Sequence, residues 1–272
     1  MGMAKHMEET TGDYDSLTND IGIMMGYTTP GQLVSMQHDL IDSVRQMSKY
    51  GVELKEAMAM RQGYIEATNR NIQFTEGDNS AMGGLYKLLG HDSGVVAQYT
   101  GGMEIFNKGV NASVDLLNKA MKTTNKMGLN GRQFAKEIVN NLKMAQKYNF
   151  KDGTEGLMRM TQWAMKTRFN MQSIGSMIDN VLEGGLEGVI EQSSRLQVLG
   201  GNAAIYSDPF SMMFNAASSA EDFGQQVLNM TKGLGSIDRK TGETSFNVNE
   251  EFMLRNIAKT LGMDVGELKD IR

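Results

Sequence analysis

The side chains able to catalyse reactions or to bind metals are few in this chain and far apart. Its three histidines are His6, His38 and His91, and it has no cysteine. No two histidines have the spacing by which one helix binds zinc. The absence of cysteine excludes disulfides, thiolate-bound zinc, iron–sulfur clusters and cysteine nucleophiles. We therefore expect no metal site, and we expect His38, which adjoins Asp39, to lie on a solvated helix surface.

Carboxylate pairs are frequent but have no catalytic pattern. Glu183 and Glu187 are four residues apart, and Glu250 and Glu251 are adjacent. Glycoside hydrolysis needs two carboxylates across a cleft, and a solvated helix face is the simpler interpretation of these pairs. Residues 238–243 mix carboxylates with glycine but lack the order of a calcium-binding loop. With histidine this scarce, a serine nucleophile has no obvious base. The sequence predicts no catalytic residue and no enzyme activity.

A glycine-rich segment was the best candidate for a phosphate-binding loop. Gly184, Gly185 and Gly188 open a predicted helix, as such a loop would. The segment lacks the Lys-Ser/Thr ending, and a helix rather than a strand is predicted before it. Glu183 and Glu187 would also repel an anion. We interpret the glycines as a helix break and predict no cofactor.

The bulk composition narrows the classes of function. The chain has 272 residues and a net charge of −5, which disfavours nucleic-acid binding because phosphate contacts need clustered cations. No apolar run approaches the ~18–20 residues of a membrane-spanning helix. The first fifteen residues lack the apolar core of a secretion signal. We expect neither a specific nucleic-acid partner nor a membrane span.

The elements that must position any site are predicted to be helices. Only 2 prolines but 31 glycines and 24 methionines favour many helices of moderate length with glycine-rich breaks. The expected fold is all-α, with elongated or bundled amphipathic helices and a small β-hairpin near residues 236–247. Four segments are expected: a flexible N-terminal segment (1–30), a partly heptad-like region (31–128), helical modules (129–234) and a C-terminal hairpin with short helices (235–272).

Apolar residues recur at helical spacing along most of the chain. A helix is expected to begin at Thr29-Pro30, and a heptad-like run from Leu33 to Ala57 fits either a coiled coil or a helical hairpin in a bundle. Residues 75–80 are expected to form a loop, and Asn130 is expected to cap a helix. The packing stripes are Phe134, Ile138, Leu142; Leu157, Met160, Ala164; and Leu186, Val189, Ile190. The methionines favour a plastic core or a subunit interface over a promiscuous binding groove.

The second half of the chain resembles phage tail tape-measure proteins, over roughly residues 130–270. The resemblance rests on an ordered series of blocks: 131–153 (GRQFAKEIVNNLKMAQKYNFKDG), 156–171 (GLMRMTQWAMKTRFNM), 196–204 (LQVLGGNAA) with Asp208-Pro209, and 238–243 (DRKTGE). None of these blocks is a catalytic motif. Family members are usually much longer, so the chain is expected to be a fragment or a module.

The resemblance implies a structural role in the virion. Tape-measure proteins are helical chains that fill the tail tube and set its length during assembly in the host cytoplasm. The partners implied are further copies of the chain in a helical bundle, tail-tube and tail-tip or baseplate proteins, and assembly chaperones. No catalytic, cofactor or metal residue is implied.

Two other functions stay open on the sequence alone. A helical-bundle adaptor or a virion cargo protein could bind partner helices through methionine-rich surfaces. A virion-associated wall-degrading enzyme is the third possibility, although the chain shows neither a histidine-based site nor a clear acid pair.

Overall fold

The computed structural model describes residues 16, 19, 22–23, 26–27, 29–70, 73–90, 92–237 and 244–270. Over these residues the protein is all-α, as predicted, apart from one pair of two-residue strands. The chain forms two compact units, Met1–Thr123 and Thr124–Arg272. The boundary lies inside helix α6, so it separates the units within a helix and not at a linker. The four-segment division expected from the sequence stays a prediction.

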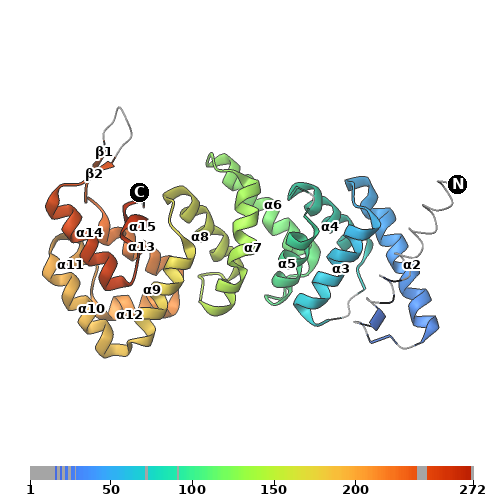
Figure 1. Ribbon diagram of the computed structural model, residues 1–272, viewed down its shortest axis with the longest axis horizontal. Helices are drawn as coiled ribbons and strands as arrows, with labels where there is room; N and C mark the ends of the chain where they lie inside the picture. The colour runs from blue at the N-terminus through green and yellow to red at the C-terminus, as the bar shows by residue number, and fades with distance from the viewer. Residues whose placement is uncertain are drawn as a thin grey trace. The chain divides into compact units, whose positions relative to one another are not determined.

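The described helices of the first unit are of moderate length and fold back on one another (Figure 1). They are α2 (Pro30–Met47), the 3-10 turn η1 (Ser48–Tyr50), α3 (Leu54–Thr68), α4 (Glu76–Leu88), α5 (Ser93–Glu104) and α6 (Val110–Lys126), whose last residues pass into the second unit. Helix α2 packs against α3 and α4, and α3 packs along α5.

Helix α2 begins where the sequence predicts. Thr29 caps it, because the Thr29 side chain accepts a hydrogen bond from the Gln32 backbone N–H while the Gln32 side chain accepts one from the Thr29 N–H. The buried residues of α2 follow the expected 4-3-4 spacing and are Met36, Leu40, Ser43 and Met47. The run to Ala57 is not one helix, since Gly51 adopts a left-handed φ of 81° before α3. Helices α2 and α3 therefore form the helical hairpin, and the run is not one continuous coiled-coil helix.

The loop predicted for residues 75–80 is wrong. Thr75 is the N-cap of α4, and its side chain and that of Asp78 form a reciprocal capping box. The polar residues that suggested a loop are those that begin a helix, because the first turn of a helix has unpaired N–H groups.

Two glycines in this unit allow close packing and are not flexible joints. A Cβ on Gly63 would lie 2.7 Å from the Ala97 Cβ, and one on Gly101 would lie 2.6 Å from the Ala67 Cβ. Both contacts join α3 to α5. These two helices approach so closely that only hydrogen fits at Gly63 and Gly101.

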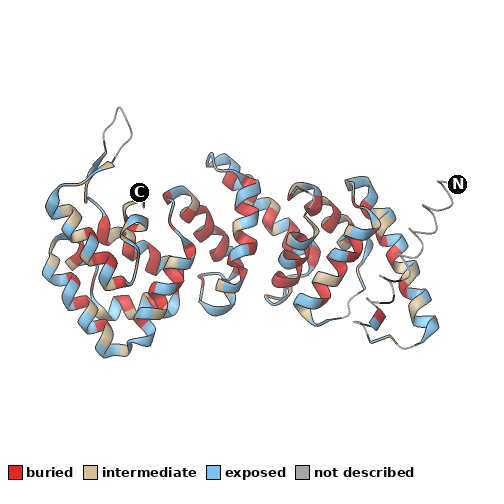
Figure 2. Ribbon diagram, viewed as in Figure 1, coloured by how far each residue is buried: buried red, intermediate tan, exposed pale blue. Residues whose placement is uncertain are grey.

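The second unit contains most of the residues that carry the sequence patterns. After the end of α6 come α7 (Gly131–Lys147), α8 (Thr154–Thr167), α9 (Met171–Glu183), α10 (Gly185–Leu199), α11 (Gly201–Ile205), α12 (Pro209–Ser218), α13 (Ala220–Thr231), α14 (Val248–Leu261) and α15 (Val265–Asp270). Buried residues line the facing sides of the helices in each unit (Figure 2).

The packing stripes were predicted correctly in two helices of three. Phe134, Ile138 and Leu142 on α7 are buried, as are the three stripe residues of α8. On α10 only Val189 is buried, whereas Leu186 and Ile190 are each 46% exposed. The buried residues of α10 are Val189, Ser193 and Leu196, at successive offsets of four and three residues. They share only Val189 with the predicted stripe. Gly185, the first residue of α10, has a left-handed φ of 57°.

The C-terminal hairpin is small. Strand β1 (Ser236–Ile237) pairs antiparallel with β2 (Thr244–Ser245), so that Ser236 faces Ser245. The turn predicted between them, residues 238–243, lies outside the described residues. The short helices expected after it are α14 and α15, and Phe252 of α14 is 61% exposed.

The methionines are mainly core residues. Met36, Met58, Met60, Met82, Met160, Met177 and Met212 are each at most 2% exposed. This burial supports the expectation of a methionine-rich core, and the alternative of a subunit interface stays a prediction. None of the helices that the structure describes is both long and apolar enough to cross a membrane.

Candidate functional site

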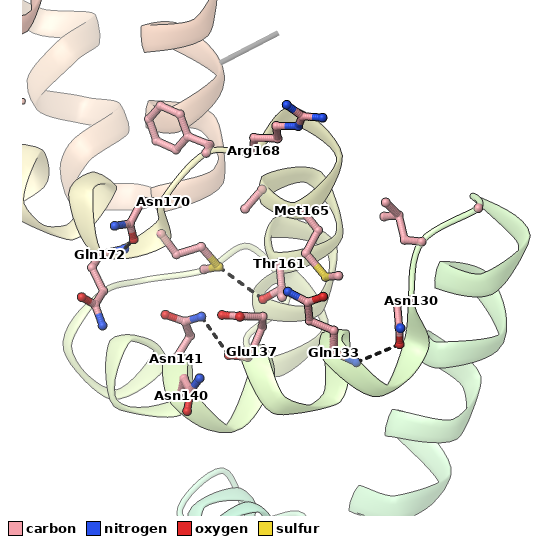
Figure 3. Close-up of a pocket in the computed structure, with 15 residues that line it drawn as sticks. Asn130, Gln133, Glu137, Asn140, Asn141, Thr161, Met165, Arg168, Asn170 and Gln172 are labelled. Carbon is pink, nitrogen blue, oxygen red and sulfur yellow. Dashed lines mark hydrogen bonds between the residues drawn. The ribbon is translucent and has the colours of Figure 1, made fainter. Parts of the chain in front are cut away.

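A polar pocket of about 790 Å³ lies in the second unit. Its wall is formed by the segment before α7, one face of α7, the C-terminal half of α8 and the start of α9 (Figure 3). This volume falls within the ~300–1,000 Å³ of typical ligand pockets. It is the candidate site that the side-chain chemistry of the described residues best supports.

Helix α7 supplies most of the polar lining. Gln133, Glu137, Asn140 and Asn141 stand at helical spacing on one side of α7, next to the apolar face that packs in the core. The helix is held at its start by Asn130, whose Oδ1 accepts hydrogen bonds from the N–H groups of residues 132 and 133 at 3.0 and 3.1 Å. The cap that the sequence predicted is thus also part of the pocket wall.

Asn141 is the one amide of this group that is buried. It is 4% exposed, and its Nδ2 donates to the backbone oxygen of Glu137 at 2.8 Å. Among the described residues no group donates to its Oδ1. Thr161 faces it across the pocket, and its hydroxyl lies 2.9 Å from the Leu157 oxygen and 3.3 Å from the Met171 sulfur. The pocket floor therefore joins α7, α8 and the first residue of α9.

The rim is formed where α8 turns into α9. Arg168 ends α8 with a left-handed φ of 58°, which is uncommon for a residue with a side chain. Its guanidinium points away from Glu137 and Asn141 (Figure 3). Asn170 then caps α9 by accepting from the Gln172 N–H at 2.9 Å. The rim therefore includes the residue that ends α8 and the residue that caps α9.

The pocket can form hydrogen bonds but has no catalytic pair. Amide side chains do not exchange protons in the pH range of proteins, and they offer donors and acceptors only. Glu137 is the single carboxylate in the lining, so no second acid or base stands beside it. The geometry fits binding of a neutral polar group better than any acid–base reaction.

Where the structure describes them, the residues considered for chemistry are either exposed or engaged in a helix cap or an ion pair. His38 is exposed on α2, as expected, and Glu183 and Glu187 are exposed. Glu250 caps α14 through the Asn247 N–H at 2.8 Å, and Glu251 pairs with Arg255 and Lys269. His6, His91 and residues 238–243 lie outside the described residues. No group of three metal-ligating side chains occurs among those described.

The amide pocket was not found from the sequence. The sequence does contain a pattern that marks it. Four polar residues share one face of the helix at offsets of four, seven and eight residues: Gln133, Glu137, Asn140 and Asn141. That pattern is also what a solvated helix face has. Only the packing of α8 and α9 beside it turns the face into a pocket.

A polar cluster of three side chains links the C-terminal end of α7 to α9. The Asp179 carboxylate accepts hydrogen bonds from Lys147 Nζ at 2.5 Å and from the Tyr148 hydroxyl at 2.8 Å. Burial by itself raises the pKa of Asp179, but the two hydrogen bonds together with the positive charge of Lys147 outweigh it and leave that pKa below its ordinary value. Burial raises the pKa of Tyr148, so Tyr148 stays a donor at neutral pH.

Acid should weaken the second unit through this cluster. A lowered carboxylate pKa stabilises the fold above the ordinary pKa of Asp, near 3.9, and that contribution is lost as the pH falls through the lower folded value. We expect Asp179→Asn to lower the thermal unfolding midpoint at pH 7 and to lower it less at pH 3. Circular dichroism melts at the two pH values measure the difference. An equal loss at both would contradict the assignment.

Comparison of the chain with known protein families, with curated proteins and with solved structures gave no match.

Proposed function

We propose that this protein is a structural component of a phage tail, namely a tape-measure protein or a part of one. The observation that carries the proposal is where the resemblance blocks lie. Block 131–153 covers α7 and the turn after it, and block 156–171 covers α8 and the entry to α9. Block 196–204 covers the junction of α10 and α11, and Asp208-Pro209 is the cap and first residue of α12. The blocks up to Pro209 therefore coincide with successive helices and junctions of one unit, and block 238–243 lies outside the described residues.

The mechanism proposed is assembly without catalysis. Copies of the chain associate through helices inside the tail tube, the tube polymerises around them, and the covered length sets the tail length. The site of action is the tail lumen of the virion, after assembly in the host cytoplasm. The partners are other copies of the chain, tube and tail-tip or baseplate proteins, and assembly chaperones.

Tail length in a phage that encodes this chain tests the proposal. An in-frame duplication should copy the whole second unit, residues 124–272, because α9 packs against α12, α13 and α14 as well as against α7 and α10. Tails should lengthen by up to ~220 Å if the added chain is extended helix, and by less if it stays folded. Electron microscopy of particles measures the change.

The matched control leaves the length of the chain unaltered. Asn140→Asp, at an exposed position of α7, should leave the tails as long as before. Intact particles with unchanged tails after the duplication would refute the ruler role. That result would favour a helical-bundle adaptor or a cargo protein, which the two exposed phenylalanines of α12 also suit.

A further inference from the structure

Helix α12 presents an apolar strip to the solvent. Phe210 and Phe214 are 68% and 70% exposed, although Met212 and Ala216 on the opposite side of the helix are buried. With Met213 and Ala217 they form offsets of three, four and seven residues, and all four residues line one shallow hollow. We call this set the α12 strip: Phe210, Met213, Phe214 and Ala217. Such offsets are those by which an amphipathic helix docks in a groove.

A groove of matching character lies between α10 and α14 of the same unit. Its volume is about 690 Å³, and its apolar lining is Val198, Leu199, Phe252 and Met253. Val198 is 87% exposed and Phe252 is 61% exposed, so the apolar lining is open to solvent. We call this feature the α10–α14 groove. Helix α10 packs against α14 and also against α12, and no α12 residue lines the groove. The strip of one molecule therefore does not fill its own groove.

The charges around the two features are complementary. Arg195 and Lys259 stand at the groove, where Lys259 has no ion-pair partner among the described residues and Arg195 pairs only with the exposed Glu191. The α12 strip has no charge of its own and is flanked by acids. Asp208 caps α12 through the Ser211 N–H, and Asp222 follows it in α13. Neither has an ion-pair partner within the described part of the chain.

The same charges disfavour a pairing of two α12 helices. An antiparallel pair would place Asp208 of one copy near Asp222 of the other, and a parallel pair would place the two Asp208 carboxylates together. Like charges across an interface oppose association, whereas opposite charges favour it. The acid-flanked strip is better matched to the groove with its Arg195 and Lys259 than to itself.

We propose that the α12 strip of one copy docks in the α10–α14 groove of a second copy. The contact is head to tail, because the two surfaces that meet are different. Contacts of this kind make rings when the rotation between copies closes and open chains when it does not. The proposal deepens the self-association in the proposed function and rests on it. It is tested on purified protein, so its failure would leave the tail-length experiment to be decided independently.

Two substitutions at exposed positions test the contact. Phe214→Asp disables the strip and Phe252→Asp disables the groove, and each should weaken self-association by about 30-fold or more, as loss of a central aromatic anchor does. The unaltered chain should gain mass with concentration in light scattering, and each variant should stay a monomer. Thermal melts should be unchanged because both side chains are exposed. Ile41→Asp, which alters a 47% exposed apolar residue of α2, is the control and should associate normally.

Mixing the two variants separates this contact from any symmetric one. The Phe252→Asp copy still has its strip and the Phe214→Asp copy still has its groove, so an equimolar mixture should form a one-to-one dimer that grows no further. Lys259→Glu should weaken association at low salt and less at high salt. Three results would overturn the proposal: a monomeric unaltered chain, a mixture that stays monomeric, or continued association of Phe252→Asp when Phe214→Asp is a monomer.

Discussion

Replacing Ile138 by Asp should unfold the second unit at temperatures where the unaltered chain is folded. Ile138 is fully buried in the middle of α7, between the turns that carry Phe134 and Leu142. A carboxylate there loses its hydration without a partner built to receive it, and the apolar contacts of isoleucine are lost as well. We expect a loss of ~4 kcal/mol or more, which is a large share of the ~5–15 kcal/mol by which a typical domain is stable.

Circular dichroism melts and urea titrations measure this loss. The control is Asn140→Asp, which introduces the same charge two residues away on the exposed side of α7. It should change the free energy of unfolding by no more than ~0.5 kcal/mol. If both variants melted like the unaltered chain, α7 could not pack as described. The proposed role in tail assembly would then also lack the packing surface that α7 is expected to supply.

The second large effect is expected from the smallest substitution, Gly156→Ala. A Cβ on Gly156 would lie 2.1 Å from the backbone oxygen of Lys151 and 3.0 Å from its carbonyl carbon. These are backbone atoms of the turn before α8, in which Asp152 and Gly153 both have positive φ. The same oxygen accepts a hydrogen bond from Arg159 at 2.9 Å. Relief of the clash must therefore deform the turn, and we expect a loss of ~2–3 kcal/mol.

Gly188→Ala is the matched control, and it is expected to raise the free energy of unfolding where Gly156→Ala lowers it. Gly188 lies within α10, and a Cβ built there meets no atom within 4 Å. Alanine loses less conformational freedom than glycine on entering a helix, so this variant should gain up to ~1 kcal/mol. Chemical denaturation of the two variants measures the contrast. A tolerated alanine at position 156 would show that the turn before α8 can move without cost.

The sequence by itself located those helix boundaries that local capping residues determine, such as the starts of α2 and α7. Thr29 with Pro30 and Asn130 were identified as starts because a cap acts on N–H groups two or three residues away. Gly51 and Gly200 end elements with positive φ, which glycine adopts without a steric penalty. Interactions this local are encoded within a few residues. At Thr75 the capping rule also holds, because Thr75 and Asp78 start α4, and the prediction of a loop there did not apply it.

The sequence also predicted the buried columns of α7 and α8, where a single apolar stripe faces a polar side. On α10 two apolar columns lie side by side, and periodicity cannot say which of them meets a neighbour. Only the packing of α9, α12 and α14 decided that Val189 is buried while Leu186 and Ile190 are not.

The amide pocket and the α12 strip were decided by the tertiary structure in the same way. The polar face of α7 becomes a pocket wall because α8 and α9 stand beside it. Phe210 and Phe214 remain exposed because α12 uses Met212 and Ala216 to pack. Helical periodicity specifies which residues share a face. Whether that face is covered depends on contacts with residues distant in the chain, and no local pattern records those contacts.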